Sequence, residues 1–144
     1  MSPIVHTVLS WARRHSLRPL AFGTSCCAQE LRAALGSSYD LGRAGCGAPA
    51  VSPRQADVLI VAGRISMKLA PALRQSYDEM LEPKWVVALG ACASSGGVFG
   101  TYAVVQGIDS IVPVDVYVPG CPPAPADVID GLGLLQQRLG KTRR

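Results

Sequence analysis

Two short, nearly continuous runs of apolar residues constrain the fold of this 144-residue chain more than any other feature. The runs are residues 57–63 and 84–90, and each of them ends at a glycine. A segment of helical composition, residues 68–81, lies between them and is closed by Pro83. Runs without polar alternation are typical of strands buried on both faces of a parallel sheet, and parallel neighbours need a crossover, usually a helix. The sequence therefore predicts an α/β fold.

Four more segments extend this pattern. Residues 20–25 and 112–118 are predicted to be strands, and residues 28–35 and 125–139 are predicted to be helices. Helices that link parallel strands by right-handed crossovers give a mostly parallel sheet with helices on both faces, as in flavodoxin-like folds. In such sheets ligands bind outside the carboxyl ends of the strands. We therefore expect the functional site at that edge.

The chain is expected to consist of three parts. Residues 1–18 are an amphipathic helix that begins at Ser2 and Pro3, residues 19–140 are one α/β domain, and residues 141–144 are a basic tail. A chain of this length suits one core. Because hydrophobic residues make up 49% of the sequence and charged residues only 17%, we expect partners to cover part of the surface.

Basic residues are concentrated at the two ends of the chain. The first 18 residues carry three arginines and no acid, the last four carry three basic residues, and the remainder has more acidic than basic residues. Aromatic residues are only 6% of the sequence, which argues against a nucleic-acid-binding surface. Basic ends favour an acidic partner or an anionic membrane surface, and solvated ends are an equally good interpretation.

The apolar runs also bear on the compartment. None of them approaches the roughly 18 to 20 residues of a membrane-spanning helix. The N-terminal residues lack the pattern of a secretory signal peptide. We therefore expect a chain that does not cross a bilayer and whose cysteines are kept reduced.

Four of the five cysteines, Cys26, Cys27, Cys92 and Cys121, follow directly after predicted strands. All four thiols are therefore expected at the carboxyl edge of the sheet. One such cysteine is as readily explained as a buried core residue, but four at one edge suggest a metal centre. The adjacent pair can serve one centre only if the backbone bends between Cys26 and Cys27.

The spacing of the cysteines bears on which metal centre they hold. Structural zinc sites draw their ligands from short C-x2-4-C knuckles, and none occurs here, because 65 positions separate Cys27 from Cys92 and 29 separate Cys92 from Cys121. Thiolates from separate loops suit an iron–sulfur cluster, whose corners spread over a wider body than one ion. A zinc site remains an alternative, and a disulfide between Cys26 and Cys27 is disfavoured in a reducing compartment.

Small residues flank the later cysteines. Gly96 and Gly97 follow Cys92 and allow backbone N–H groups to approach the sulfides of a cluster. Gly120 precedes Cys121 and permits an unusual backbone turn. A phosphate-binding loop is less well supported, because the glycine and lysine spacing of such motifs is absent.

Six stretches of the sequence carry a family resemblance: CCAQE (residues 26–30), SPRQAD (52–57), APALR (70–74), EPKW (82–85), GACASSGG (90–97) and VPVDVYVPGCPP (112–123). They resemble the B subunit of proton-pumping NADH-quinone oxidoreductase, respiratory complex I, and the similarity extends over residues 11–139. The resemblance implies that the 19–140 domain holds one [4Fe–4S] cluster, with Cys26, Cys27, Cys92 and Cys121 as its ligands.

The same resemblance implies a function and a set of partners. The chain would pass electrons from the iron–sulfur chain of a proton-translocating NADH-quinone oxidoreductase, through this terminal cluster, to quinone. Its partners would be the C and D subunits of the peripheral arm, the membrane H subunit, quinone and the membrane surface, and not nucleic acid. It would lie peripherally on the cytoplasmic side of the cell inner membrane.

The chain departs from the family pattern at several positions. Gln29, Leu31 and Arg32 stand where relatives commonly have one isoleucine and two methionines. Because those methionines approach the quinone cavity in relatives, Arg32 bears on the type or affinity of the quinone. Glu30 is expected to orient the loop, to influence proton uptake, or to pair with an arginine. Cys46 is an extra thiol that we interpret as non-ligating.

Two other functions fit parts of the sequence. The first is the small subunit of a related energy-converting membrane hydrogenase or of an F420- or ferredoxin-linked complex, although hydrogenase relatives usually space the first two ligands as C-x-x-C. The second is a thiol sensor on a flavodoxin-like sheet that holds zinc or no metal. An assay of iron and acid-labile sulfide distinguishes the sensor from the cluster protein.

Overall fold

The computed structural model describes residues 3–141 of the chain. Within this range four parallel strands form one sheet in the order β1-β2-β3-β4. The strands are β1 (Pro19–Gly23), β2 (Val58–Ala62), β3 (Trp85–Leu89) and β4 (Val116–Val118). Every residue of β2 and all but the first of β3 are buried, as expected for the two central strands. The structure thus confirms the predicted parallel α/β sheet.

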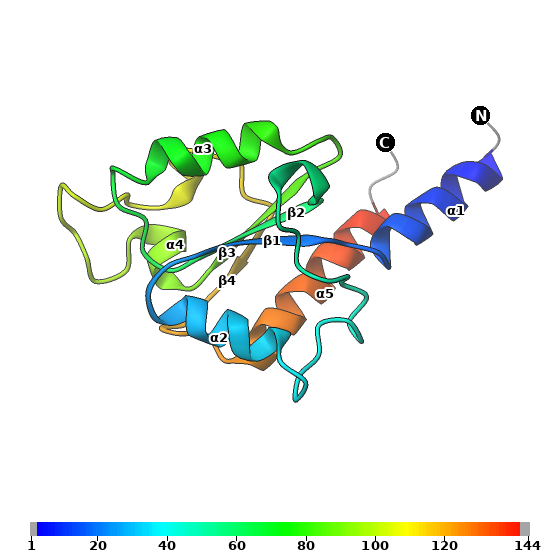
Figure 1. The fold of residues 1–144 in the computed structure, drawn as a ribbon, viewed down its shortest axis with the longest axis horizontal. Helices are drawn as coiled ribbons and strands as arrows, with labels where there is room; N and C mark the ends of the chain where they lie inside the picture. The colour runs from blue at the N-terminus through cyan, green and yellow to red at the C-terminus, as the bar shows by residue number, and fades with distance from the viewer. Residues whose placement is uncertain (1–2, 142–144) are drawn as a thin grey trace.

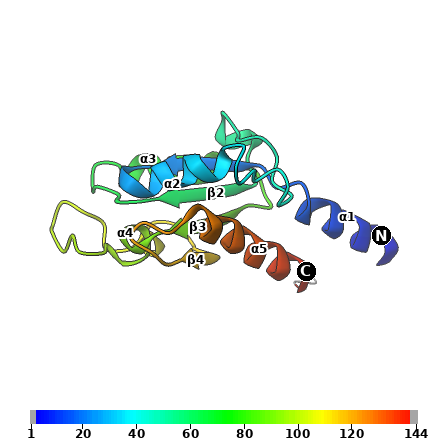
Figure 2. The ribbon, with the colours of Figure 1, turned by 90° about the horizontal axis from the view of Figure 1, so that it is seen from below.

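Helices cover both faces of the sheet, so that the fold has three layers (Figure 1). Figure 2, seen from below, has the helices of one face in front of the sheet. Each face has its own core, because alternate residues of a strand point to opposite faces. Ile60 belongs to the core formed with α2 and α5, and its neighbour Leu59 to the core formed with α3 and α4. The bounds are α2 (Ser25–Leu35) and α5 (Pro125–Lys141) on one face, and α3 (Ala70–Glu79), α4 (Ala91–Ser95) and the short 3-10 helices η1 (Pro53–Gln55) and η2 (Ile108–Ser110) on the other.

The connection from β1 to β2 explains why helices lie on opposite faces although the strand order follows the sequence. After α2 the chain passes along the outer edge of β1, where Leu17 and Cys46 form a parallel bridge. The Leu17 N–H donates to the Gly45 carbonyl at 3.3 Å, and the Gly47 N–H donates to the Leu17 carbonyl at 2.7 Å. This bridge takes the place of an outermost strand in the flavodoxin-like order 2-1-3-4-5. The winding direction therefore changes between β1 and β2, which is where such folds bind ligands.

Several predicted elements have different bounds in the structure. The predicted helix 1–18 ends at Arg14, and the predicted strand 20–25 ends at Gly23 because α2 already begins at Ser25. Of the predicted strand 112–118 only β4 forms, because Pro113 has no N–H to donate and the Asp115 carboxylate accepts the backbone N–H of Val86 at 2.8 Å. Of the predicted helix 68–81 only α3 forms, and Met80 at its end has extended backbone angles.

The first helix, α1 (Pro3–Arg14), extends beyond the sheet and packs against α5 (Figure 1). Several of its apolar side chains are exposed, including Ile4 at 72% and Trp11 at 61%. The predicted cap Ser2 and residues 142–144 of the predicted tail lie outside the described residues.

The division of the chain into an N-terminal helix, one domain and a tail stays a prediction. Among residues 3–141, no helix is both long enough and apolar enough to span a bilayer.

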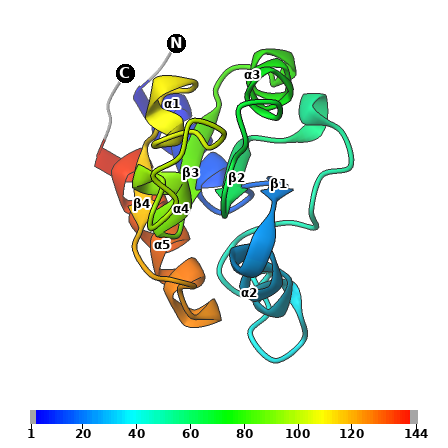
Figure 3. The same cartoon turned by 90° about the vertical axis from the view of Figure 1, so that its left-hand side faces the viewer.

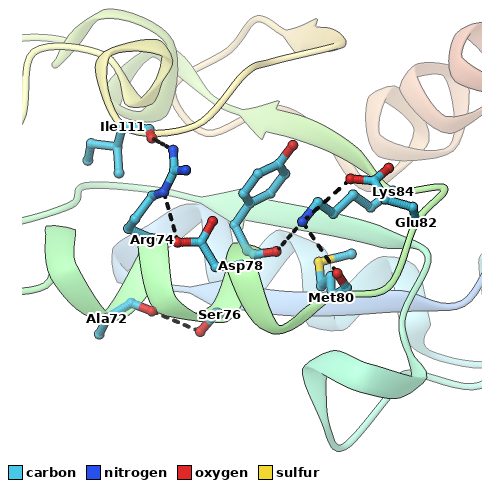
Figure 4. Close-up of polar contacts among 9 residues, drawn as sticks. Ala72, Arg74, Ser76, Asp78, Met80, Glu82, Lys84 and Ile111 are labelled. Carbon is cyan, nitrogen blue, oxygen red and sulfur yellow. Dashed lines mark hydrogen bonds and ion pairs between the residues drawn. The ribbon is translucent and has the colours of Figure 1, made fainter.

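A polar network lies at the amino ends of β3 and β4 (Figure 4). Lys84, directly before β3, donates to the Tyr77 carbonyl at 2.9 Å, and its ammonium lies 4.1 Å above the centre of the Tyr77 ring. Arg74 forms an ion pair with Asp78 at 3.0 Å and donates to the Ile111 carbonyl at 2.9 Å. These contacts join the end of α3 to the segments that enter the two strands.

Candidate metal centre

The adjacent cysteines lie in the first turn of α2, and not in a loop before it. The unusual backbone is one residue earlier than predicted, because Ser25 has φ +60°. In a helix, consecutive side chains are about 100° apart around the axis. Cys26 is accordingly exposed and Cys27 is buried, so the two thiols occupy different sides of the helix start.

Thr24 connects this turn to the neighbouring strand. Its hydroxyl does not cap α2; it donates to the Arg64 carbonyl at 2.6 Å and lies 3.2 Å from the Ala62 carbonyl. Gly63, between these two acceptors, has φ +91°, and a Cβ there would lie 2.0 Å from the Thr24 carbonyl oxygen. The carboxyl ends of β1 and β2 are therefore fixed in close contact.

Gly90 makes room for the thiol of Cys27. It has φ +90°, and a Cβ at this position would lie 2.6 Å from Cys27 Sγ. Its N–H donates to the Val118 carbonyl at 2.8 Å, which ties the end of β3 to the end of β4. Glycine is required here both by the backbone conformation and by the space that the sulfur occupies.

Cys92 and Cys121 come from the next two strand ends. Cys92 lies in α4 and is buried, whereas Cys121 follows β4 and is exposed. The N–H of Ala91 donates to the Gly120 carbonyl at 2.8 Å, so the residues that precede the two cysteines are hydrogen-bonded to each other. Gly97 leaves space beside Cys92, because a Cβ there would lie 3.1 Å from its Sγ.

Neighbouring cysteines contribute to the pKa shifts of the two buried thiols, Cys27 and Cys92. Burial, followed by the charge and hydrogen bond of Cys26 and by the charges of Cys92 and Cys121, raises the pKa of Cys27 to about 12. The pKa of Cys92 is also raised, by burial first and then by Cys121 and Cys26. Thiolates so placed repel one another unless a cation offsets their charge, and a coordinating metal does this.

The arrangement bears on which metal centre could fit. Over residues 3–141, no three histidine, cysteine, aspartate or glutamate side chains lie together as the ligands of one metal ion. A single zinc ion needs its sulfur ligands at about 2.3 Å, whereas a cubane offers four iron corners on a wider body. All five cysteines are free thiols, so Cys26 and Cys27 form no disulfide.

Cys46 lies apart from this group, beside Leu17 at the outer edge of β1. It is 3% exposed, and burial alone raises its pKa to about 11. No other cysteine contributes to that shift.

Sequence reasoning did not single out Arg64 and Phe99. Arg64 is at the carboxyl end of β2, and its guanidinium carbon lies 4.4 Å from the centre of the Phe99 ring. Its positive charge acts on Cys92, where it opposes the rise in pKa. The signal was present, because Arg64 follows a predicted strand just as the cysteines do.

Figure 3 views the molecule from the side where the start of α2, the helix α4 and the loop after α4 face the reader. A doubly wound α/β fold with four cysteines at this edge belongs to the class of proteins that could hold a metal centre on thiolates from separate loops. Comparison with known proteins then identifies the family. A family model described as "NADH ubiquinone oxidoreductase, 20 Kd subunit" matches residues 25–135, and the chain belongs to this family.

Curated relatives support the same assignment. The chain is 54% identical over 135 residues to the second NADH-quinone oxidoreductase B subunit of Chloroflexus aurantiacus, which covers 94% of this chain and 78% of the relative. It is 59% identical over 130 residues to the protein of the same name from Cytophaga hutchinsonii, covering 90% of this chain and 72% of the relative. The predicted family resemblance is thus confirmed.

Solved structures agree with the fold. A chain of the membrane-bound sulfane sulfur reductase, an archaeal respiratory membrane complex, superposes with a TM-score of 0.89 at 34% identity, over 95% of this chain and 77% of that one. A chain of an NAD+-reducing [NiFe]-hydrogenase gives a TM-score of 0.61 at 16% identity, over 85% and 92% of the two chains. The second likeness concerns the fold alone, and it confirms the predicted fold class.

Proposed function

We propose that this chain is the electron-transferring B subunit of a proton-translocating NADH-quinone oxidoreductase. One [4Fe–4S] cluster, held by Cys26, Cys27, Cys92 and Cys121, would receive electrons from the iron–sulfur chain of the complex and pass them to quinone. The observation that supports the proposal is that all four cysteines follow the carboxyl ends of strands, where Gly90 lies against the Cys27 sulfur and Ala91 is hydrogen-bonded to Gly120. The sequence identity of 54% to 59% to proteins that bear this name supports it.

The residues of the chain contribute position and environment. Cys27 and Cys92 would anchor the centre from inside, because both are buried, whereas Cys26 and Cys121 would hold it from the surface. Gly90 and Gly97 keep the space beside the two inner sulfurs free. When bound, the cluster supplies a one-electron relay, and the protein sets its surroundings.

The partners and the location are part of the proposal. We expect contacts with the C and D subunits of the peripheral arm, with the membrane H subunit and with quinone, on the cytoplasmic side of the cell inner membrane. Exposed apolar residues on α1 support docking at that end, and Val98 and Tyr102, which are 84% and 97% exposed, support it near the cysteines. The basic ends of the chain fit an anionic membrane surface better than nucleic acid.

A second candidate is a component of a related respiratory membrane complex with another electron acceptor. The superposition on a chain of the sulfane sulfur reductase, with a TM-score of 0.89, favours it. The identity to that chain is 34%, lower than the 54% to 59% shared with the NADH-quinone oxidoreductase proteins, and we therefore rank this candidate second.

The test is a pair of cysteine variants that differ in position. We expect the purified chain or complex to contain about four iron atoms per chain and an equal amount of acid-labile sulfide. Cys92→Ser should abolish the electron paramagnetic resonance (EPR) signal of the cluster, and Cys46→Ser, the matched control, should retain it. Near-zero iron in the unmodified protein, or the reverse pattern in the two variants, would show the proposal to be wrong.

A further inference from the structure

Arg64 lies at the switch point of the sheet, between the segments that carry the cysteines. Its carbonyl accepts the hydroxyl of Thr24, two residues before Cys26, at 2.6 Å. Arg64 is itself exposed, so its guanidinium is not held by burial. The backbone of this residue is thus fixed to the first cysteine segment, and its side chain needs another support.

Phe99 supplies that support from the other cysteine segment. The Arg64 guanidinium carbon lies 4.4 Å from the centre of the Phe99 ring, within the range of a cation–π contact. The Phe99 N–H donates to the Gly96 carbonyl at 3.2 Å, and its own carbonyl accepts the Gln106 side-chain amide at 2.8 Å. These hydrogen bonds fix the backbone of Phe99 next to the turn that ends α4, the helix that contains Cys92.

Backbone hydrogen bonds join the two supports directly. The Val105 N–H donates to the Ile65 carbonyl at 2.9 Å, and the Met67 N–H donates to the Ala103 carbonyl at 2.9 Å. Together they flank the antiparallel bridge between Ser66 and Val104. Backbone hydrogen bonds therefore connect the segment after Arg64 to the loop that carries Phe99. These bonds fix the positions of the guanidinium and the ring relative to each other.

We propose that Phe99 is a positioning residue that holds the Arg64 guanidinium beside Cys92, and that this fixed cation raises the reduction potential of the cluster. The inference rests on the proposed function, because it requires a cluster on the four cysteines. A fixed positive charge favours the reduced state, which carries one more negative charge. The geometry supports the placement, because Phe99 is hydrogen-bonded to Gly96 and the next residue, Gly97, lies against the sulfur of Cys92, where a Cβ would be 3.1 Å from Sγ.

The experiment measures the midpoint potential of the cluster by an EPR-monitored redox titration of the assembled complex. Arg64→Met removes the charge and should lower the potential, with a change of about three- to tenfold in the equilibrium constant for one-electron reduction, where tenfold corresponds to about 59 mV. Phe99→Leu keeps apolar bulk without the ring and should lower it by part of that shift. Phe99→Tyr keeps the ring and should restore the original value.

Two controls separate positioning from other effects. In the double variant Arg64→Met with Phe99→Leu, the potential should equal that of Arg64→Met alone, because Phe99 acts through Arg64. Arg54→Met removes an arginine from η1, at the amino-end side of β2, and should leave the potential unchanged.

The outcomes are distinguishable. An intact cluster signal with unchanged potentials in Arg64→Met and Phe99→Leu would overturn this inference and leave the proposed function standing. The inference would also be overturned if Phe99→Leu shifted the potential further in the Arg64→Met background. Loss of the cluster in Arg64→Met or in Phe99→Leu would overturn it as well. Absence of a cluster from the unmodified complex would overturn the proposed function and this inference with it.

Discussion

The amino and carboxyl ends of the parallel strands differ in how their polar and titratable side chains are partnered. At the amino ends of β3 and β4, the charged groups have partners: Lys84 donates to two carbonyls at the end of α3, and Arg74 binds both Asp78 and the Ile111 carbonyl (Figure 4). At the carboxyl ends, the other three clustered thiols add to the rise in the pKa of Cys27, and Arg64 is the cation that opposes the rise at Cys92. The amino end stabilises the fold, whereas the carboxyl end brings together thiols that raise one another's pKa, which is a common mark of a functional site.

The largest expected effect tests the carboxyl end. Gly90→Ala introduces a Cβ at φ +90° and at 2.6 Å from Cys27 Sγ, and should lower the free energy of unfolding by about 2–4 kcal/mol and greatly reduce the iron content. Equilibrium urea unfolding and an iron assay measure the two effects. The matched control is Gly133→Ala in α5, where no heavy atom other than those of its chain neighbours and its own helix backbone lies within 4 Å of the new Cβ. It should stabilise the chain by up to about 1 kcal/mol and keep the iron. Equal losses in both variants would contradict the steric argument.

The next effect tests the amino end. Lys84→Met removes the donor that satisfies the carbonyls of Tyr77 and Met80, from a side chain that is only 10% exposed. The free energy of unfolding should fall by about 1–3 kcal/mol, and the iron content should not change. Lys68→Met, on an exposed lysine, should stay within about 0.5 kcal/mol of the original chain. Loss of the cluster in Lys84→Met would mean that the two ends are not independent.

The smallest effect concerns Asp115. Burial raises the pKa of this carboxyl above its usual value of 3.8, although the N–H of Val86 and the charge of Arg138 act in the opposite direction. The folded chain therefore holds the proton more tightly than the unfolded chain, and the group contributes most stability below pH 3.8 and loses it as the pH rises through its folded pKa. Asp115→Asn should remove this dependence.

The measurement is the free energy of unfolding at several pH values for both proteins. The stability of the original chain relative to Asp115→Asn should decline as the pH rises from about 3 to 6. A relative stability that instead rises with pH would show that the hydrogen bond from Val86, and not burial, dominates.

The central strands could be predicted from the sequence because their burial on both faces leaves long apolar runs. The outermost strand of the flavodoxin-like order could not be predicted. Only a single bridge, at Cys46, takes its place, and the sequence around Cys46 contains no apolar run. The predicted extent of β4 was wrong. Pro113 has no N–H to donate to a neighbouring strand, and the backbone N–H of Val86 bonds to the Asp115 side chain.

The position of the four cysteines after strand ends could be predicted from the sequence, whereas their role as ligands stays a prediction. The rule that ligands bind at the carboxyl edge was enough to bring Cys26, Cys27, Cys92 and Cys121 together. The helical placement of the pair was not predicted, because it depends on the positive φ of Ser25, which no residue pattern announces. Arg64 also follows a predicted strand, but an exposed arginine is common on protein surfaces, and its contact with Phe99 is visible only in the structure.

The bridge at Leu17 and Cys46 has a consequence for assembly. The backbone groups at the entrance to β1 are already satisfied by residues 45–50, including the Ala50 N–H, which donates to the Pro19 carbonyl at 2.8 Å. At the opposite margin, β4 is only three residues long. Both margins are therefore poor templates for an incoming strand. We therefore expect partner subunits to bind through side chains and helices and not by adding a strand to the sheet. The same two margins disfavour edge-to-edge pairing between copies of this chain.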